Sequence, residues 1–291
     1  MIFHLKNKTA IVTGATKGLG EITAQMLVQN GANVIICSRS EEDLFETKKT
    51  LERFSVHGNT VLALKCDVSE PADVQQLVEN SLAQFGTCEI LVNNAGVYGP
   101  KGCFEELELE DWKRAFDINF YGSVLITRLL IPHFKSQRYG KIVQLSGGGA
   151  TGPLPMLSAY AASKAAIVRF METLSRELSP YNVDINAVAP GALNTRLLDE
   201  VIDAGPAVVG EKFYKKSLEQ ASSGGNSIEL AAELLCFLSS DKSDGITGKL
   251  ISAVWDNWRD FEGRGEELTS SDVMTLRRLN GALSGLDWVD V

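Results

Sequence analysis

Two hydrophobic patterns alternate along most of this chain, and their alternation limits its fold more than any other feature. Short runs rich in β-branched residues are typical of buried strands, and the longer amphipathic stretches between them are typical of helices. A repeat of roughly 25–30 residues predicts an α/β fold, in which a parallel sheet has helices on both faces. The seven predicted strands are Thr9–Thr13, Asn33–Ser38, Val61–Cys66, Ile90–Asn93, Lys141–Leu145, Asp184–Ala189 and Lys249–Ala253. The predicted helices are Leu19–Asn30, Glu41–Phe54, Glu70–Phe85, Asp111–Phe134, Ala159–Leu178 and Glu229–Ser239.

Two segments depart from this alternation. Residues 195–227 contain breaks rich in glycine, proline and serine, and we interpret them as a mobile flap over a site; a passive surface insertion is the alternative. Residues 255–291 follow the last predicted strand and contain a short helix candidate at Val273–Leu279. The sequence leaves open whether this extension packs on the domain, reaches a neighbouring subunit or covers the site. We therefore expect one domain over residues 1–254 and a C-terminal extension over residues 255–291.

Composition and charge exclude several other classes of protein. The 291 residues are 44% hydrophobic and 22% charged, which is ordinary for a globular protein and excludes intrinsic disorder. No run approaches the roughly 18 apolar residues of a membrane span, so no membrane partner is expected. A net charge of −9 without a long basic block argues against nucleic acid as a partner. The five cysteines are scattered without a CxxC pair, so we expect reduced thiols, no metal site and a cytoplasmic location.

A glycine-rich turn joins the first predicted strand to the first predicted helix. Between Thr13 and Gly20 the glycines are spaced Gly-x3-Gly-x-Gly. Glycine permits a tight turn and lets the backbone approach a pyrophosphate closely. The free N–H groups at the start of the following helix attract the anion. Because both the strand and the helix are predicted, the motif indicates dinucleotide binding.

With this spacing the sequence resembles the short-chain dehydrogenase/reductase family, and four further marks of that family follow in order. They are Asn93-Asn-Ala-Gly96, Asn119, Tyr160-x3-Lys164, and Pro190-Gly191 with Thr195. The resemblance covers about residues 6–254 and implies a single Rossmann-type, doubly wound domain. It also implies a homodimer or homotetramer, with the helices at 111–134 and 159–178 in the interface. The cofactor-binding residues that it implies are Gly14, Thr16, Lys17, Gly18, Leu19, Gly20, Ser38, Arg39, Asp67, Val68, Asn93, Ala95, Gly96, Tyr160, Lys164, Pro190, Gly191 and Thr195.

The end of the second predicted strand bears on which cofactor is bound. An acidic residue there would hold the ribose hydroxyls of NAD. This chain instead has Ser38 followed by Arg39, and Lys17 lies in the first loop. Two cations near the ribose suit a 2′-phosphate, so we expect NADP(H) to be preferred over NAD(H). The alternative is that both are solvated surface charges. Asp67 matches the family's contact with the adenine amine.

Tyr160 and Lys164 are four residues apart on a predicted helix, so they share one face. A nearby ammonium stabilises phenolate, and we expect it to lower the pKa of the phenol from its usual value of about 10. In the family the tyrosine exchanges a proton with the substrate oxygen. The lysine binds the ribose of the nicotinamide, and a water links it to the main chain at the position of Asn119.

The serine that completes the family's catalytic set is out of place. The commonest spacing puts it thirteen residues before the tyrosine, where this chain has Gly147. Serine there helps to polarise the substrate carbonyl. Because adjacent glycines make a shift of one residue easy, we assign the role to Ser146. Thr151 and Ser158 are weaker candidates.

These features predict an NADP(H)-dependent oxidoreductase that interconverts a ketone and a secondary alcohol, with Tyr160 as general acid/base. A non-catalytic NADP(H)-binding regulator or scaffold is the main alternative, and a nucleotide-sugar dehydratase or epimerase is a lesser one. Residues 150–157, 97–104 and 195–227 are expected to wall the substrate pocket. A 3-oxoacyl thioester, a sugar, a cyclitol and a small ketone are all compatible substrates.

Overall fold

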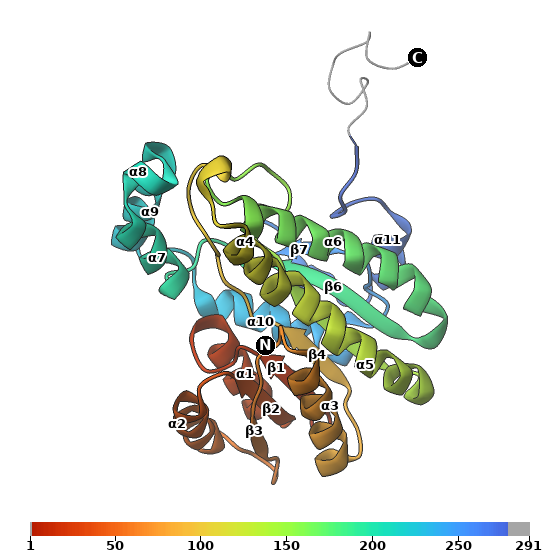
Figure 1. The fold of residues 1–291 in the computed structure, drawn as a ribbon. Coiled ribbons are helices and arrows are strands. Elements are labelled where there is room, and N and C mark those ends of the chain that lie inside the picture. The colour runs from red at the N-terminus through yellow and green to blue at the C-terminus, as the bar shows by residue number, and fades with distance from the viewer. Residues whose placement is uncertain (1, 279–291) are drawn as a thin grey trace.

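Seven parallel strands form the centre of the computed structural model, which describes residues 2–278 (Figure 1). Their order across the sheet is β3-β2-β1-β4-β5-β6-β7. The strands are β1 (Thr9–Thr13), β2 (Asn33–Ser38), β3 (Val61–Lys65), β4 (Ile90–Asn93), β5 (Gly140–Leu145), β6 (Val183–Ala189) and β7 (Leu250–Ser252). The chain builds outward from β1 to β3 and then returns to place β4 beside β1, so the strand order reverses between them. The predicted doubly wound α/β fold is confirmed, and its ligand crevice is expected at this reversal.

Helices cover both faces of the sheet (Figure 1). The main helices are α1 (Gly18–Gln29), α2 (Glu41–Glu52), α3 (Pro71–Phe85), α4 (Leu109–Phe116), α5 (Gly122–Gln137), α6 (Ser158–Leu178) and α10 (Ile228–Leu238). Their limits follow local chemistry: α3 begins with Pro71 and ends before Gly86, which adopts the left-handed conformation that suits a helix end. The single helix predicted over 111–134 is divided by a π-helical turn, Asp117–Tyr121, between α4 and α5.

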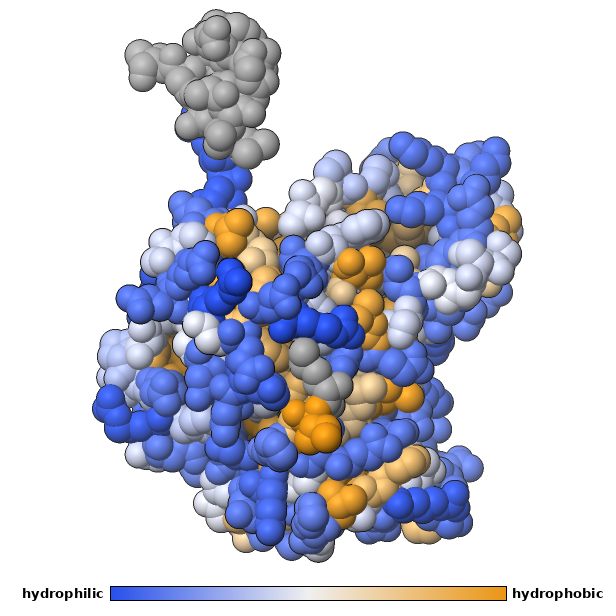
Figure 2. All heavy atoms as spheres, turned by 180° about the vertical axis from the view of Figure 1, so that it is seen from behind, coloured by the Kyte–Doolittle hydropathy of each residue, from blue (hydrophilic) through white to orange (hydrophobic). Residues whose placement is uncertain are grey.

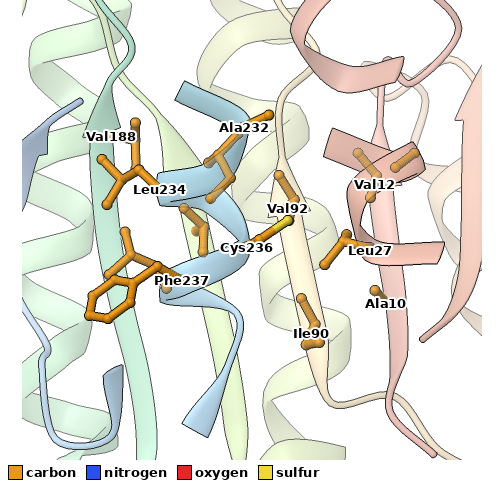
Figure 3. Close-up of a cluster of buried hydrophobic side chains, with 14 of the residues drawn as sticks. Ala10, Val12, Leu27, Ile90, Val92, Val188, Ala232, Leu234, Cys236 and Phe237 are labelled. Carbon is orange, nitrogen blue, oxygen red and sulfur yellow. The ribbon is translucent and has the colours of Figure 1, made fainter. Parts of the chain in front are cut away.

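The strands are apolar along their whole length because helices bury both of their faces. Neighbouring residues of β1 therefore belong to opposite halves of the core, with Val12 on one side and Ile11 on the other. Figure 3 shows the first half, where Leu27 of α1 and the apolar side chains of α10 lie over β1, β4 and β6. Helices α3, α5 and α6 bury the other half. The core thus holds the strand ends, and the loops that follow them, in fixed positions.

The segment predicted as a flap forms three short helices that project as a lobe (Figures 1 and 2). They are α7 (Arg196–Ala204), α8 (Pro206–Val209) and α9 (Glu211–Ser223). The backbone at Gly205 and Gly210 has positive φ, which separates the helices sharply. Within residues 2–278, no helix combines the length and the apolar character that crossing a membrane requires.

The chain after β7 packs back onto the sheet. It includes α11 (Gly265–Ser270), and it then runs along β7, where the Leu250 amide donates to the carbonyl oxygen of Met274 (2.8 Å). The Lys249 ammonium donates to the carbonyl oxygens of Ser271 and Val273. The helix predicted at 273–279 is therefore wrong through residue 278, because tertiary bonds hold these carbonyls in an irregular path with a turn at Met274; Leu279 lies outside the described residues. The path covers the edge of β7, which would otherwise be open to pairing with another strand.

Two tryptophans three residues apart in this segment should differ sharply in their contribution to stability. Trp258 is 1% exposed and packs against Phe237 of α10, whereas Trp255 is 86% exposed. We expect Trp258→Ala to lower the free energy of unfolding by about 3–5 kcal/mol, and Trp255→Ala to change it by less than about 0.5 kcal/mol. Chemical denaturation of both variants measures the difference. Equal losses would show that the segment after β7 does not pack as described.

Candidate active site

A large cleft opens beyond the carboxyl ends of the strands and has a volume of about 1500 Å³. The loops after β1, β2, β4, β5 and β6 form its floor, and α7 and α9 contribute to one wall; Figure 2 shows the lobe of these helices standing out from the body. Most of the predicted site residues line this cleft. They are Gly14, Thr16, Lys17, Gly18, Leu19, Ser38, Arg39, Asp67, Val68, Ala95, Gly96, Ser146, Tyr160, Lys164, Pro190, Gly191 and Thr195.

Three predicted residues are close to the cleft but do not line it. The Asn93 side chain is buried and donates to the hydroxyl of Thr127 in the core (3.2 Å). Gly20 lies beneath the loop after β1, where a Cβ would collide with the carbonyl oxygen of Gly14. Asn119 is 1% exposed. These three residues therefore support the residues that line the cleft without being exposed to it themselves.

The loop after β1 has the geometry of a phosphate cradle. Gly14 and Gly18 have φ near +60°, which strongly favours glycine. Lys17 is the N-cap residue of α1 and its side chain makes no capping bond, so no side-chain cap occupies the N–H groups of the first turn. The Asn94 amide donates to the carbonyl oxygens of Thr13 (2.9 Å) and Gly14 (3.0 Å), which ties this loop to the one after β4. These features fit the pyrophosphate of a dinucleotide.

The charges at the β2 end of the cleft are partly paired with one another. The Lys17 ammonium lies 2.8 Å from the Asp43 carboxylate, so its charge is partly compensated. Ser38 and Arg39 follow without an acidic neighbour at the ribose position. Burial alone would raise the pKa of Asp67, but bonds from Ser69 and the nearby charge of Arg39 outweigh it and hold the pKa below its usual value. Asp67 is therefore an ionised hydrogen-bond acceptor at this end.

The loop after β6 closes the opposite end of the cleft. Gly191 has φ +89°, and the neighbouring residue Ala192 exchanges two bonds with Asn226, each of 2.8 Å. Asn226 therefore ties the end of the 195–227 segment to the residues just before its beginning, beside the cleft. The sequence analysis did not identify this residue. Across the opening, the Lys101 ammonium pairs with the Glu200 carboxylate of α7 at 3.2 Å. This ion pair connects the lobe to the loop after β4.

The side chain of Asn119 acts as a clamp on the loop after β4. Its Oδ1 accepts from the amide of Val97, and its Nδ2 donates to the carbonyl oxygen of the same residue, both at 2.8 Å. The same Nδ2 also donates to the hydroxyl of Ser163 in α6 (3.0 Å). Asn119 lies in the π-helical turn, a distortion that is frequent at functional sites. Its side chain thus has a structural role, and the predicted water relay through its main chain stays a prediction.

Tyr160 and Lys164 lie side by side at the floor of the cleft, on α6. The Lys164 ammonium is 5.6 Å from the centre of the Tyr160 ring and donates to the carbonyl oxygen of Leu145 (2.7 Å). Burial lowers the pKa of Lys164 to about 8. Burial, with a smaller contribution from Tyr98, raises the pKa of Tyr160 well above its usual value. The expectation that the ammonium lowers the pKa of this phenol is therefore wrong, because burial of the phenol disfavours its ionised form.

Position 147, not position 146, faces the phenol of Tyr160. A Cβ on Gly147 would collide with the hydroxyl of Tyr160. The Ser146 hydroxyl is fully buried and has no hydrogen-bond partner, while its amide bonds to the carbonyl oxygen of Val188 (2.9 Å). Of the weaker candidates, Ser158 accepts a bond from the Trp112 indole (3.1 Å), and Thr151 lies exposed at the mouth of the cleft.

Comparison with known proteins agrees with this geometry. A family model described as short chain dehydrogenase matches residues 8–204. The chain is 36% identical to "11-beta-hydroxysteroid dehydrogenase-like 3" of Arabidopsis thaliana over 195 residues, which are 66% of this chain and 62% of that protein. It is 32% identical to "Dehydrogenase/reductase SDR family member 4" of Sus scrofa over 85% of this chain and 86% of that protein. The structure of NAD+-bound xylitol dehydrogenase matches with a TM-score of 0.77 and 26% identity, covering 85% of this chain and 98% of that one.

The chain therefore belongs to the short-chain dehydrogenase/reductase family. Its members bind a nicotinamide cofactor, and the cleft described above fits such a molecule. The family assignment makes the protein an oxidoreductase that acts on an alcohol or a ketone.

The burial of Lys164 should reduce stability at neutral pH. The folded pKa of about 8 lies below the unfolded value, so the folded protein binds fewer protons between the two values and its stability rises with pH across that window. We expect Lys164→Met to be more stable than the wild type at pH 7 by about 1–2 kcal/mol. This figure combines roughly 3 kcal/mol from relief of the buried charge with a loss of about 1 kcal/mol for the bond to Leu145.

Denaturation at pH 7 and at pH 10 measures this effect, with Lys49→Met, at an exposed lysine of α2, as the control. The stability difference between Lys164→Met and the wild type should shrink at pH 10, where Lys164 is largely neutral in the folded protein. A difference that is the same at both values, or a loss of stability at pH 7, would contradict the depressed pKa.

Proposed function

We propose that this protein is an NADP(H)-dependent oxidoreductase that interconverts a ketone and a secondary alcohol, with Tyr160 as general acid/base. The observation that carries the proposal is the placement of Tyr160 and Lys164 at the floor of the same cleft whose other end holds the phosphate cradle. A dinucleotide that spans the cleft would bring its reactive end to the phenol. Both parts of the reaction would then be fixed by one rigid sheet.

The loop after β1, Lys164 and Tyr160 each have a distinct role in the proposed reaction. When bound, the nicotinamide cofactor supplies or accepts the hydride. The loop from Gly14 to Gly20 and the start of α1 bind its pyrophosphate, and the Lys164 ammonium binds the ribose next to the nicotinamide. Tyr160 exchanges a proton with the substrate oxygen. The phenol is protonated at neutral pH, which is the form that donates a proton to a ketone, and its raised pKa makes it a weaker acid than a free phenol.

The preference for NADP(H) rests on the β2 end of the cleft. Arg39 follows Ser38 there, and no carboxylate stands at the position that would bind ribose hydroxyls. Lys17 is paired with Asp43, so Arg39 is the cation better placed to bind a 2′-phosphate. The similar xylitol dehydrogenase structure holds NAD+, so NAD(H) is the competing cofactor and the preference needs a direct test.

We further propose that residues 195–227 form a flap over the substrate and that residues 255–291 are an extension of one domain spanning 1–254. The Lys101–Glu200 ion pair and the bonds of Asn226 support the flap, because they connect both sides of the segment to the cleft. The homo-oligomeric state and the cytoplasmic location stay predictions from the sequence.

A non-catalytic NADP(H)-binding regulator is the second candidate. Gly147 favours it, because that position offers no hydroxyl to the substrate. A panel of carbonyl compounds, including small ketones, oxidised sugars and cyclitols, and 3-oxoacyl thioesters, separates the two when reduced-cofactor absorbance is followed. Oxidation of NADPH by any member supports the enzyme, and cofactor binding without turnover of any member supports the regulator.

The contribution of Arg39 can be measured through cofactor affinity. We expect Arg39→Ala to raise the dissociation constant for NADPH by about 10–100-fold, since a hydrogen bond to a charged group contributes about 1.5–3 kcal/mol. Affinity for NADH should change by less than about threefold. Fluorescence titration measures both constants, with Arg53→Ala, at an exposed arginine after α2, as the matched control. Equal losses for the two cofactors would remove the basis for the NADP(H) preference.

Replacement of the phenol hydroxyl tests the proposed acid/base. We expect Tyr160→Phe to reduce turnover by about 10²–10⁴-fold, because the substrate oxygen loses its proton donor. The dissociation constant for NADPH should stay within about twofold of the wild type, and Tyr121→Phe, at an exposed tyrosine, should behave as the wild type. Steady-state kinetics and titration give both quantities, and undiminished turnover in Tyr160→Phe would refute the assignment.

A further inference from the structure

The reactive phenol of this protein lacks the usual serine neighbour. The residue that faces the hydroxyl of Tyr160 is Gly147, and the space beside it cannot hold a side chain without moving the ring. Ser146 does not compensate in this arrangement, because its hydroxyl is sealed from the cleft and has no partner. A ketone bound at Tyr160 would therefore need its second hydrogen bond from another group.

Tyr98 is in the position to supply that bond. It lines the cleft, and its ring meets the ring of Tyr160 edge to face, with the centroids 4.7 Å apart. Within residues 2–278, no hydrogen bond engages the hydroxyl of Tyr98, although the side chain is half-buried. Tyr98 and Tyr160 thus place two phenol side chains with unpaired hydroxyls side by side on the cleft wall.

The surroundings of Tyr98 hold it in place and keep it protonated. Asn119 clamps the preceding residue, Val97, through both its amide and its carbonyl. The Lys101 ammonium lies 5.8 Å from the Tyr98 ring centre and pairs with Glu200. Burial, and then the charge of Glu200, raise the pKa of Tyr98, so its hydroxyl remains a donor at neutral pH.

We propose that Tyr98 donates a hydrogen bond to the substrate carbonyl oxygen and so takes the part of the missing serine in polarising it. The inference rests on the proposed function. As the carbonyl carbon gains the hydride, its π electron pair moves onto oxygen, which takes the proton of Tyr160. Tyr98 shares its proton with the developing oxyanion and keeps it, so the charge is stabilised where it forms.

The test is Tyr98→Phe, which keeps the ring contact with Tyr160 and removes only the hydroxyl. The probes are NADPH and a series of para-substituted aryl ketones and aldehydes. We expect kcat to fall by about 10²-fold, the effect typical of removing one oxyanion donor. The loss should be largest for the least electrophilic carbonyls, because these depend most on polarisation. The melting temperature and the dissociation constant for NADPH should match the wild type.

Two further variants sharpen the result. Ser146→Ala measures what the buried hydroxyl contributes, and its loss of kcat should be clearly smaller than that of Tyr98→Phe. Incorporation of a fluorinated tyrosine at position 98 strengthens the donor and should speed the reduction of the poorest substrates. If Tyr98→Phe does not fold, the fluorinated variant by itself tests whether the Tyr98 hydroxyl polarises the substrate carbonyl.

Several outcomes would overturn the inference. Wild-type kinetics in Tyr98→Phe would show that another donor acts. A loss that is uniform across the carbonyl series would indicate a packing role, and a larger loss in Ser146→Ala would return the role to the serine. If the wild-type protein reduces no carbonyl probe, the proposed function itself fails and this inference fails with it, an outcome distinct from a difference between variants.

Discussion

The parallel pairing of β1 with β4 brings the loops that follow both strands to the same edge of the sheet, and every part of the site depends on that juxtaposition. The hydroxyl of Thr13 accepts from the amides of Asn94 and Ala95, and the Asn94 side chain bonds back to the loop after β1. The phosphate cradle and the wall of the substrate pocket are therefore parts of one bonded unit. From this unit, Asn119 extends the same rigidity to α6, which carries the reactive pair.

The reactive pair is held at the expense of stability. Lys164 and Tyr160 are both buried, and desolvation disfavours the charged form of each. The fold tolerates this because the half of the core that α3 and α5 share with α6 holds that helix against the sheet. The proposed proton transfer would gain from this arrangement, since groups held in place need little rearrangement when a ligand arrives. The extension after β7 adds to the framework by covering the last strand of the sheet.

Much of the fold could be predicted from the sequence because its signals are local. All seven strands lie within about two residues of their predicted limits, since β-branched runs and the glycines that end them act over a few residues. The residues of the predicted motifs could also be picked out from the sequence, because each keeps a fixed spacing to a strand end or along a helix. Three features were not found. The π-helical turn at Asp117–Tyr121, the irregular path after α11 and the bonds of Asn226 all depend on partners remote in sequence.

The sequence by itself determined the parallel sheet, the order of the motifs and the identities of Tyr160 and Lys164, because periodicity and spacing along a strand or helix are properties of neighbouring residues. Only the tertiary structure decided which groups face the reactive phenol. It placed Gly147 against Tyr160, sealed the hydroxyl of Ser146 and brought Tyr98 alongside, although the loop after β4 is more than sixty residues from Tyr160 along the chain. Burial and its effect on pKa likewise arise only when these distant segments exclude water together.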